Sequence, residues 1–147
     1  MKNAILFGIG NTIVSLIIVI LAKNNAVGNS YDAFSFIIPI SAFITGFILW
    51  KLMTRSNSKP STLSIIFNGL STGVLYLILT FVMIVVYLNL CYQLTGNCLD
   101  SNGAAPEGIF NMLPSALFLS IYALLWFGWL SVLGAIFVGL IIKKSAK

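Results

Sequence analysis

Residues 62–90 read TLSIIFNGLSTGVLYLILTFVMIVVYLNL, an apolar stretch without a charged side chain. The hydrocarbon core of a bilayer is about 30 Å thick and is crossed by roughly 20 apolar residues in a helix. This stretch exceeds that requirement by about nine residues. It therefore predicts a transmembrane helix that tilts in the membrane or projects beyond the lipid.

The composition of the whole chain indicates the same environment. Hydrophobic residues make up 59% and charged residues 7% of the 147 residues, whereas a soluble domain carries about 25% charged residues. So few charges cannot cover a folded domain in water. The apolar runs are continuous, which favours helices over a transmembrane barrel, whose strands alternate apolar and polar residues. We therefore expect an all-α integral membrane protein with a single membrane domain over 1–147.

Four apolar stretches predict four transmembrane helices in an up-down bundle. Their expected positions are about 4–22, 33–53, 62–90 and 115–142, with an outer loop at 91–114. The first stretch is longer than the core of a signal peptide, about 7–15 residues, so we expect it to stay in the membrane. The last apolar run, from Gly108 to Ile142, is too long for one straight crossing. We expect residues 108–114 to form a short surface helix or an extension outside the membrane.

The distribution of charge predicts the orientation. In a four-span bundle both termini share a side with the connector between the second and third spans. That side carries seven basic and no acidic residues: Lys2, Lys51, Arg55, Lys59, Lys143, Lys144 and Lys147. The other side carries one basic and three acidic residues: Lys23, Asp32, Asp100 and Glu107. The positive-inside rule then predicts cytoplasmic termini, in the inner membrane of a bacterium. The excess of basic over acidic residues does not require a nucleic-acid partner, because the C-terminal lysines suit the anionic headgroups of the lipid bilayer.

Both cysteines of the chain fall in the predicted outer loop. Cys91 and Cys98 are separated by six residues, and an oxidising compartment outside the cytoplasm favours their pairing. We predict a disulfide that pins the end of the third helix to its loop. A redox function would require a CxxC motif or a second pair, as in the quinone-linked disulfide oxidases with four helices, so thiol chemistry is disfavoured.

The predicted spans lack the side chains that usually carry chemistry inside a membrane. No Asp, Glu, His or Arg lies within any of them. Such groups are the usual carriers of proton relays and ion coupling, and small four-helix multidrug transporters depend on a glutamate in the first helix. With no histidine in the chain and its three acids in connectors, general acid–base catalysis has no candidate. We expect no catalytic residue, no metal site and no cofactor.

Small and weakly polar residues recur in the spans instead. Small residues allow helix backbones to approach closely, and buried amides and hydroxyls hydrogen-bond between helices. The pattern predicts either a tightly packed inner half or a polar pocket open to the cytoplasm, and the sequence alone does not separate the two. The residues that we assign to helix packing or to this pocket are Asn11, Thr45, Asn68, Gly69, Ser71, Gly73 and Ser131.

Aromatic side chains mark two further places. Trp50 and Lys51 close the second span in a pairing typical of a membrane interface, with the indole at headgroup depth. Tyr122, Trp126 and Trp129 form a stripe at helical spacing in the fourth span. We interpret this stripe either as ordinary bundle packing or as a face that meets a partner helix or a lipid-like ligand.

Two classes of function follow from these observations. The first is a non-enzymatic membrane protein that binds another membrane protein as an accessory subunit, an immunity protein or an assembly factor. The second is a small transporter or channel that works as an oligomer. A third, the handling of lipid-linked substrates, comes from residues 7–12, FGIGNT, which loosely resemble the start of small four-helix proteins implicated in moving lipid-linked sugars. The second span ends in Trp50-Lys51-Leu52-Met53, where that family carries an Asn-Arg and aromatic signature. We favour the first class.

Overall fold

The computed structural model describes residues 1–25, 32–55, 60–98 and 104–145, and the secondary structure within these ranges is entirely helical. Four of its helical segments are long and apolar enough to cross a membrane. The fourth of these consists of two α-helices joined by a π-helix. The elements are α1 (Lys2–Asn25), α2 (Asp32–Met53), α3 (Thr62–Thr95), α4 (Ile109–Ala123), η1 (Leu124–Gly128) and α5 (Trp129–Ser145).

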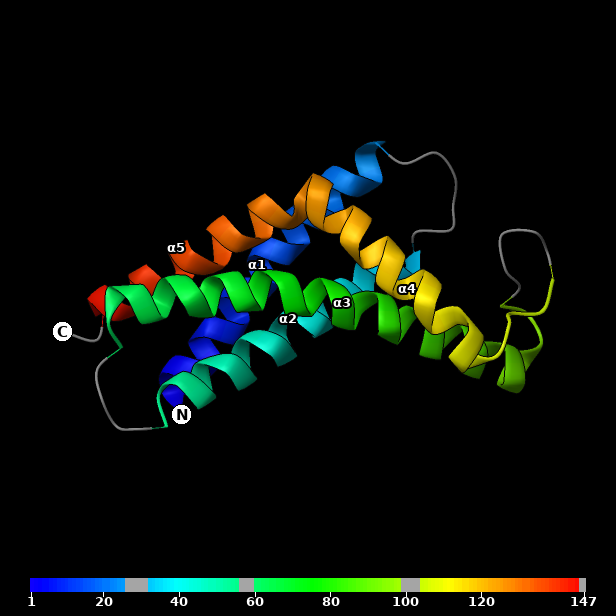
Figure 1. The fold of residues 1–147 in the computed structure, drawn as a ribbon, viewed down its shortest axis with the longest axis horizontal. Helices are drawn as coiled ribbons and strands as arrows, with labels where there is room; N and C mark the ends of the chain where they lie inside the picture. Colours follow the sequence, from blue (N-terminus) through cyan, green and yellow to red (C-terminus); the bar gives the residue numbers. More distant parts are fainter. Residues whose placement is uncertain (26–31, 56–59, 99–103, 146–147) are drawn as a thin grey trace.

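The start of α1 and the end of α5 lie at the same end of the bundle, and the end of α3 lies at the opposite end (Figure 1). We call the first the basic end, because Lys2, Lys51 and Lys143 lie there at the ends of their helices. The second is the distal end. The α3 helix contacts α2, α4, η1 and α5, while α1 packs between α2 and α5. The longest helix is therefore also the central one.

One layer near the basic end joins four helices. Phe7 of α1 stacks on Trp50 of α2, with their ring centroids 4.6 Å apart. Gly139 of α5 lies against both rings and against Ile65 of α3, so that a Cβ added at Gly139 would lie 2.7 Å from Ile65. We call these four residues the basal layer. The indole of Trp50 is 2% exposed and lies inside the bundle. Its expected position at a lipid interface is therefore wrong, because Phe7 and the space above Gly139 accept the ring.

The third and fourth spans are longer than the first two, and the additional length lies at the distal end. From the basal layer to the distal ends of α1 at Asn25 and α2 at Asp32, each helix rises about 27 Å. From the same layer to the end of α3 at Thr95 and the start of α4 at Ile109, the length measured along the helices is about 45 Å. The longer pair therefore extends about 18 Å further. We call the parts that project beyond α1 and α2 (Figure 1), residues 84–95 and 109–120, the distal hairpin.

The long apolar run at the C-terminal end is accommodated by a bend. Residues 109–114 form the start of α4 and no separate surface helix, and Pro114 lies within α4. The chain then changes direction at η1, between α4 and α5 (Figure 1). A single π-helical turn is a recognised cause of helix kinks. The bend lets α5 pack against α1 and α3 while α4 follows α3 toward the distal end.

Candidate functional site

A stripe of polar side chains runs along the buried face of α3. Asn68, Thr72, Tyr76 and Thr80 are four residues apart and all are buried. The Thr72 hydroxyl donates to Asn68 Oδ1 at 3.4 Å, and the Thr80 hydroxyl donates to the Tyr76 carbonyl at 2.8 Å. The hydroxyls of Tyr76 and Ser131 are 2.6 Å apart and form a hydrogen bond between α3 and α5. The stripe is therefore hydrogen-bonded both along its own helix and across to its neighbour.

Two glycines beside this stripe bring the backbones of α3 and α5 together. A methyl group on Gly73 would lie 2.9 Å from both the Cα and the N of Val132. One on Gly69 would lie 2.9 Å from the N of Ile136. These are backbone atoms, which cannot rotate away as the end of a side chain can. Three of the residues predicted for packing or a pocket thus meet at the α3–α5 interface, namely Gly69, Gly73 and Ser131, while Asn68 is buried beside them on α3.

Another of the predicted residues, Asn11, lies at the α1–α2 interface. Asn11 is buried, donates through Nδ2 to the Phe7 carbonyl at 2.7 Å, and packs over Gly46 of α2. The Thr45 hydroxyl donates to the carbonyl of Ser41 in its own helix. Ser71 is half-buried on α3. The structure therefore places predicted residues at two helix interfaces: Gly69, Gly73 and Ser131 between α3 and α5, and Asn11 between α1 and α2.

A disulfide fixes the tip of the distal hairpin. Cys91, in the last turns of α3, is bonded to Cys98, and their Cα atoms are 5.6 Å apart. Between them Gly96 ends the helix with φ 70°, a left-handed conformation that favours glycine, and its N–H donates to the Tyr92 carbonyl. The predicted disulfide is present, and it holds the end of α3 to the turn that follows.

Few polar contacts join the two helices of the distal hairpin. The buried amide of Asn89 donates to the Val85 carbonyl at 3.0 Å and contacts the Met112 sulfur across the hairpin at 3.5 Å. The other buried residues here are Ile84 and Val85 on α3 and Ala116 and Ser120 on α4. Since α4 packs mainly against α3, much of its surface is uncovered.

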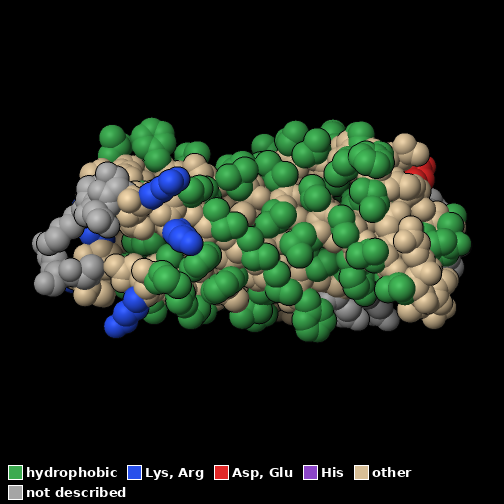
Figure 2. Space-filling view, turned by 90° about the horizontal axis from the view of Figure 1, so that it is seen from below, with side chains coloured by type: hydrophobic (Ala, Val, Ile, Leu, Met, Phe, Trp, Pro, Cys, Tyr) green, Lys and Arg blue, Asp and Glu red, His purple; other side chains and the backbone are tan. Residues whose placement is uncertain are grey.

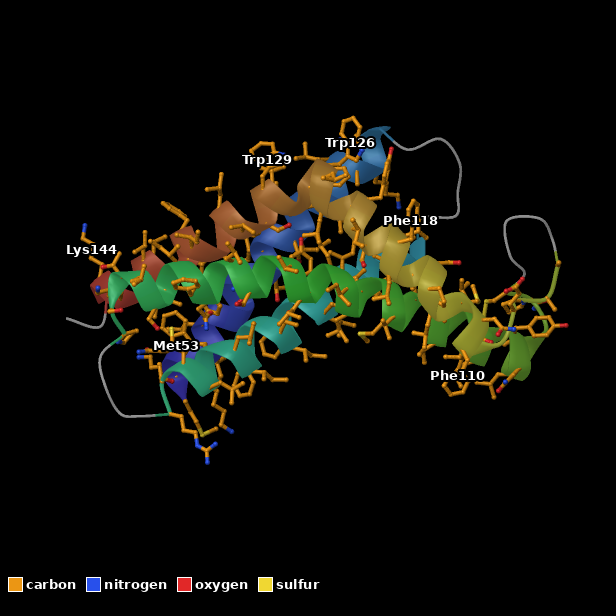
Figure 3. The ribbon with its side chains drawn as sticks, viewed as in Figure 1. Met53, Phe110, Phe118, Trp126, Trp129 and Lys144 are labelled. Carbon is orange, nitrogen blue, oxygen red and sulfur yellow. A yellow bond between two sulfur atoms is a disulfide. The ribbon has the colours of Figure 1, made fainter. Side chains whose placement is uncertain are left out.

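Large apolar side chains occupy this uncovered surface. Phe110 is 86% exposed, Leu94 82% and Phe118 70%. Figure 3 shows Phe110 and Phe118 pointing away from the ribbon on different sides of α4. Tyr87, Leu90 and Leu117 are further large side chains exposed on the hairpin. Among the described residues between 84 and 120, Glu107 is the only one with a charged side chain. The projecting part of the molecule is therefore apolar and nearly uncharged.

The aromatic stripe continues this surface onto η1. Tyr122, Trp126 and Trp129 are each more than half exposed, and both indoles point outward from the bundle (Figure 3). The rings of Tyr122 and Trp126 have their centroids 6.4 Å apart, and Trp129 Nε1 donates to the Trp126 carbonyl at 3.1 Å. The three rings are thus held on the outside of the bundle, next to the bend.

Two residues that matter to this geometry were not singled out by the sequence patterns. Tyr76 supplies the hydrogen bond between α3 and α5. It continues the four-residue spacing from Asn68 to Thr72, and this spacing was the signal that could have found it. Asn89 lies nine residues beyond Thr80 and contacts Met112 across the hairpin. Within the described residues, no group of three His, Cys, Asp or Glu side chains is placed to bind a metal.

Comparison with protein-family models, with curated proteins and with solved structures finds no match to this chain. No relative therefore assigns a function, and only the contacts of the chain itself bear on it.

Proposed function

We propose that this chain is a non-enzymatic protein of the bacterial inner membrane that binds another membrane protein through the distal hairpin and the adjoining aromatic stripe. The observation that carries this proposal is the apolar surface of the hairpin, which projects about 18 Å beyond α1 and α2 and exposes Leu94, Phe110 and Phe118. An accessory subunit, an immunity protein or an assembly factor would use such a surface.

The length of α1 supports the placement of this surface outside the hydrocarbon. From Lys2 to Lys23 the helix rises about 32 Å, which matches a hydrocarbon core of about 30 Å. With α1 spanning the core, the distal hairpin extends into the headgroups and beyond. Burying one large apolar side chain that is exposed to water is worth about 1.5–3 kcal/mol. Several such side chains on one small projection favour a partner that covers them.

The charge distribution supports an orientation with both termini in the cytoplasm. Lys and Arg side chains gather at the basic end and an acidic side chain lies at the other end, with hydrophobic side chains along the length between them (Figure 2). Positive charge is retained on the cytoplasmic side of most membrane proteins. The disulfide then lies in an oxidising compartment, which agrees with its position at the distal end.

The polar residues support packing over transport. Asn11, Thr45 and Thr80 donate to carbonyl groups of their own helices, and Tyr76 bonds to Ser131. A solute path in a small oligomeric transporter would instead need polar groups that face open space. The transporter alternative predicts solute flux in vesicles that Asn68→Leu abolishes, and the proposed function predicts no such flux.

Photo-crosslinking in native membranes tests the proposal. A photoreactive phenylalanine analogue is placed at Phe110 or Phe118 in the hairpin and, as a control, at Phe67. Phe67 is 63% exposed and belongs to the basic half of α3, which faces lipid. We expect one discrete adduct with a different membrane protein from the two hairpin positions and none from Phe67. Adducts with lipid alone, or with a second copy of this chain alone, would contradict the proposal.

A substitution pair tests the same surface without a probe. Phe118→Ala is expected to reduce copurification of the crosslinked protein at least several-fold, because truncating a large aromatic anchor usually costs more than about 1 kcal/mol. Phe67→Ala removes the same side chain from a lipid-facing site and should leave copurification unchanged. Equal yields from the two variants would exclude the hairpin as the binding surface.

A further inference from the structure

A groove runs between α1 and α5 on the opposite half of the molecule from the distal hairpin. It has a volume of about 480 Å³ and begins at the basic end with Lys2 and Asn3 of α1 and Ser145 of α5. It continues along Leu6, Ile9 and Ile13, with Val138 and Ile141 opposite. One end of the groove is therefore polar and cationic, and the rest is apolar.

The floor of the groove exists because the two helices cross closely. Gly10 lies against Val138, and a Cβ at this glycine would collide with the valine side chain. One turn further along, Gly134 of α5 lies against Val14 of α1 in the same way. These reciprocal contacts bring the helices together at their crossing, while Ile9 and Ile13 stay exposed on the rim. The close approach of the two helices, set by glycine on valine, therefore determines the floor of the groove.

The dimensions of the groove match one leaflet of a bilayer. From Lys2 to Ile13 the helix rises about 16 Å, and half of a hydrocarbon core is about 15 Å. An acyl chain that lay along Leu6, Ile9 and Ile13 would place its headgroup at Lys2. Lys143 is occupied elsewhere, since its Nζ donates to Thr62 Oγ1 at 2.9 Å, but Lys144 is exposed beside Ser145.

We propose that this groove binds one anionic phospholipid, with an acyl chain along α1 and the phosphate at Lys2. The charge at this end selects the lipid, because basic pockets between helices attract anionic headgroups. A zwitterionic lipid of the same chain length would gain the apolar contacts alone. The site is independent of the proposed partner surface, which lies at the distal end.

Native mass spectrometry with lipid titration tests the site. The purified protein in detergent is titrated with phosphatidylglycerol or with phosphatidylcholine of identical chains, and the bound fraction is read from the intact mass. We expect phosphatidylglycerol to bind more tightly by about fivefold or more, the effect of one basic residue near an anionic lipid. Equal binding of the two lipids would overturn the proposal.

Two matched pairs of variants separate the headgroup from the chain contacts. Lys2→Gln should weaken phosphatidylglycerol binding about fivefold and leave phosphatidylcholine binding unchanged. Lys51→Gln removes an exposed charge from the same end, on α2, and should change neither. Ile13→Trp fills the groove and should weaken the binding of both lipids, whereas Ile48→Trp on the exposed side of α2 should not. If Lys2→Gln or Ile13→Trp gives the same lipid binding as its control variant, the groove is not the binding site.

Discussion

Tyr76 illustrates how this chain accommodates a large polar side chain inside an apolar bundle. It is 3% exposed, and its hydroxyl has one partner from another helix, the hydroxyl of Ser131. Ser131 in turn donates to the Phe127 carbonyl at 3.0 Å, next to the bend at η1. One side chain of α3 is therefore coupled to the backbone of the fourth span at the point where it changes direction.

Removing the Tyr76 hydroxyl should cost a modest, measurable amount of stability. Hydrogen bonds between membrane helices are worth about 0.6–2 kcal/mol, so Tyr76→Phe is expected to lower the free energy of unfolding in mixed micelles by that amount. Tyr122→Phe is the control, since Tyr122 is exposed. A double-mutant cycle with Ser131→Ala should show coupling between positions 76 and 131. Additive effects of the two substitutions on the free energy of unfolding would contradict the hydrogen bond between Tyr76 and Ser131.

The glycines at the α3–α5 interface should tolerate no added methyl group. Gly73→Ala is expected to destabilise the protein by about 1–3 kcal/mol, because the Cβ would meet backbone atoms of Val132 and force the helices apart. Gly108→Ala, where a Cβ meets nothing within 4 Å, is the matched control. A neutral or stabilising effect of Gly73→Ala on the free energy of unfolding would contradict this prediction. It would show that the gain in helix propensity from alanine exceeds the cost of separating the two helices.

The sequence allowed the small residues to be assigned to helix contacts but not to specific neighbours. The spacing along α3 places three of these residues, Asn68, Gly69 and Gly73, on one face of the helix, and all three are buried. Which helix this face would meet depends on the crossing of four helices, which no local pattern contains. Trp50 was misplaced for the same reason. An indole at the end of an apolar run suits both a lipid interface and a buried layer, and only the facing Phe7 decides between them.

At the level of the elements, the disulfide stabilises only the end of α3. It closes a loop with a sequence separation of 7, and its loss should cost the hairpin tip roughly 2–3 kcal/mol by the loop-closure relation. Cys98→Ser is therefore expected to speed amide hydrogen exchange at residues 92–98 and to leave the exchange of residues near the basal layer unchanged. A uniform increase along the chain would show that the disulfide supports the whole bundle.

The lengths of the elements were only partly predictable. Continuous hydrophobicity identified four spans, and all four are present as apolar helices. The third continues to Thr95, beyond its expected end at residue 90, because Tyr92, Gln93 and Thr95 keep a helical backbone that Gly96 then ends. Nothing in the composition of Leu124–Gly128 distinguishes a π-helix from an α-helix. The bend separates α4, which packs on α3, from α5, which packs on α1 and α3, and this packing is not visible in one sequence.

At the scale of the whole molecule, the two ends have opposite chemical character. The basic end carries lysines and the buried basal layer, and the distal end carries the disulfide, one described acidic side chain and an otherwise uncharged apolar surface. A reporter fused after Lys147 is expected to be active only in the cytoplasm, and one inserted between Asn102 and Gly103 only outside it. Matching signals from both positions would contradict the orientation on which the partner surface depends.

Native mass spectrometry of the protein, extracted gently from its own membrane without reducing agent, tests the central claim most directly. The account predicts a stoichiometric complex with a second membrane protein that Phe118→Ala dissociates and Phe67→Ala does not, and a mass that contains the Cys91–Cys98 disulfide. A monomer or a homo-oligomer as the only species would contradict it, and would favour transport or lipid handling by this chain alone.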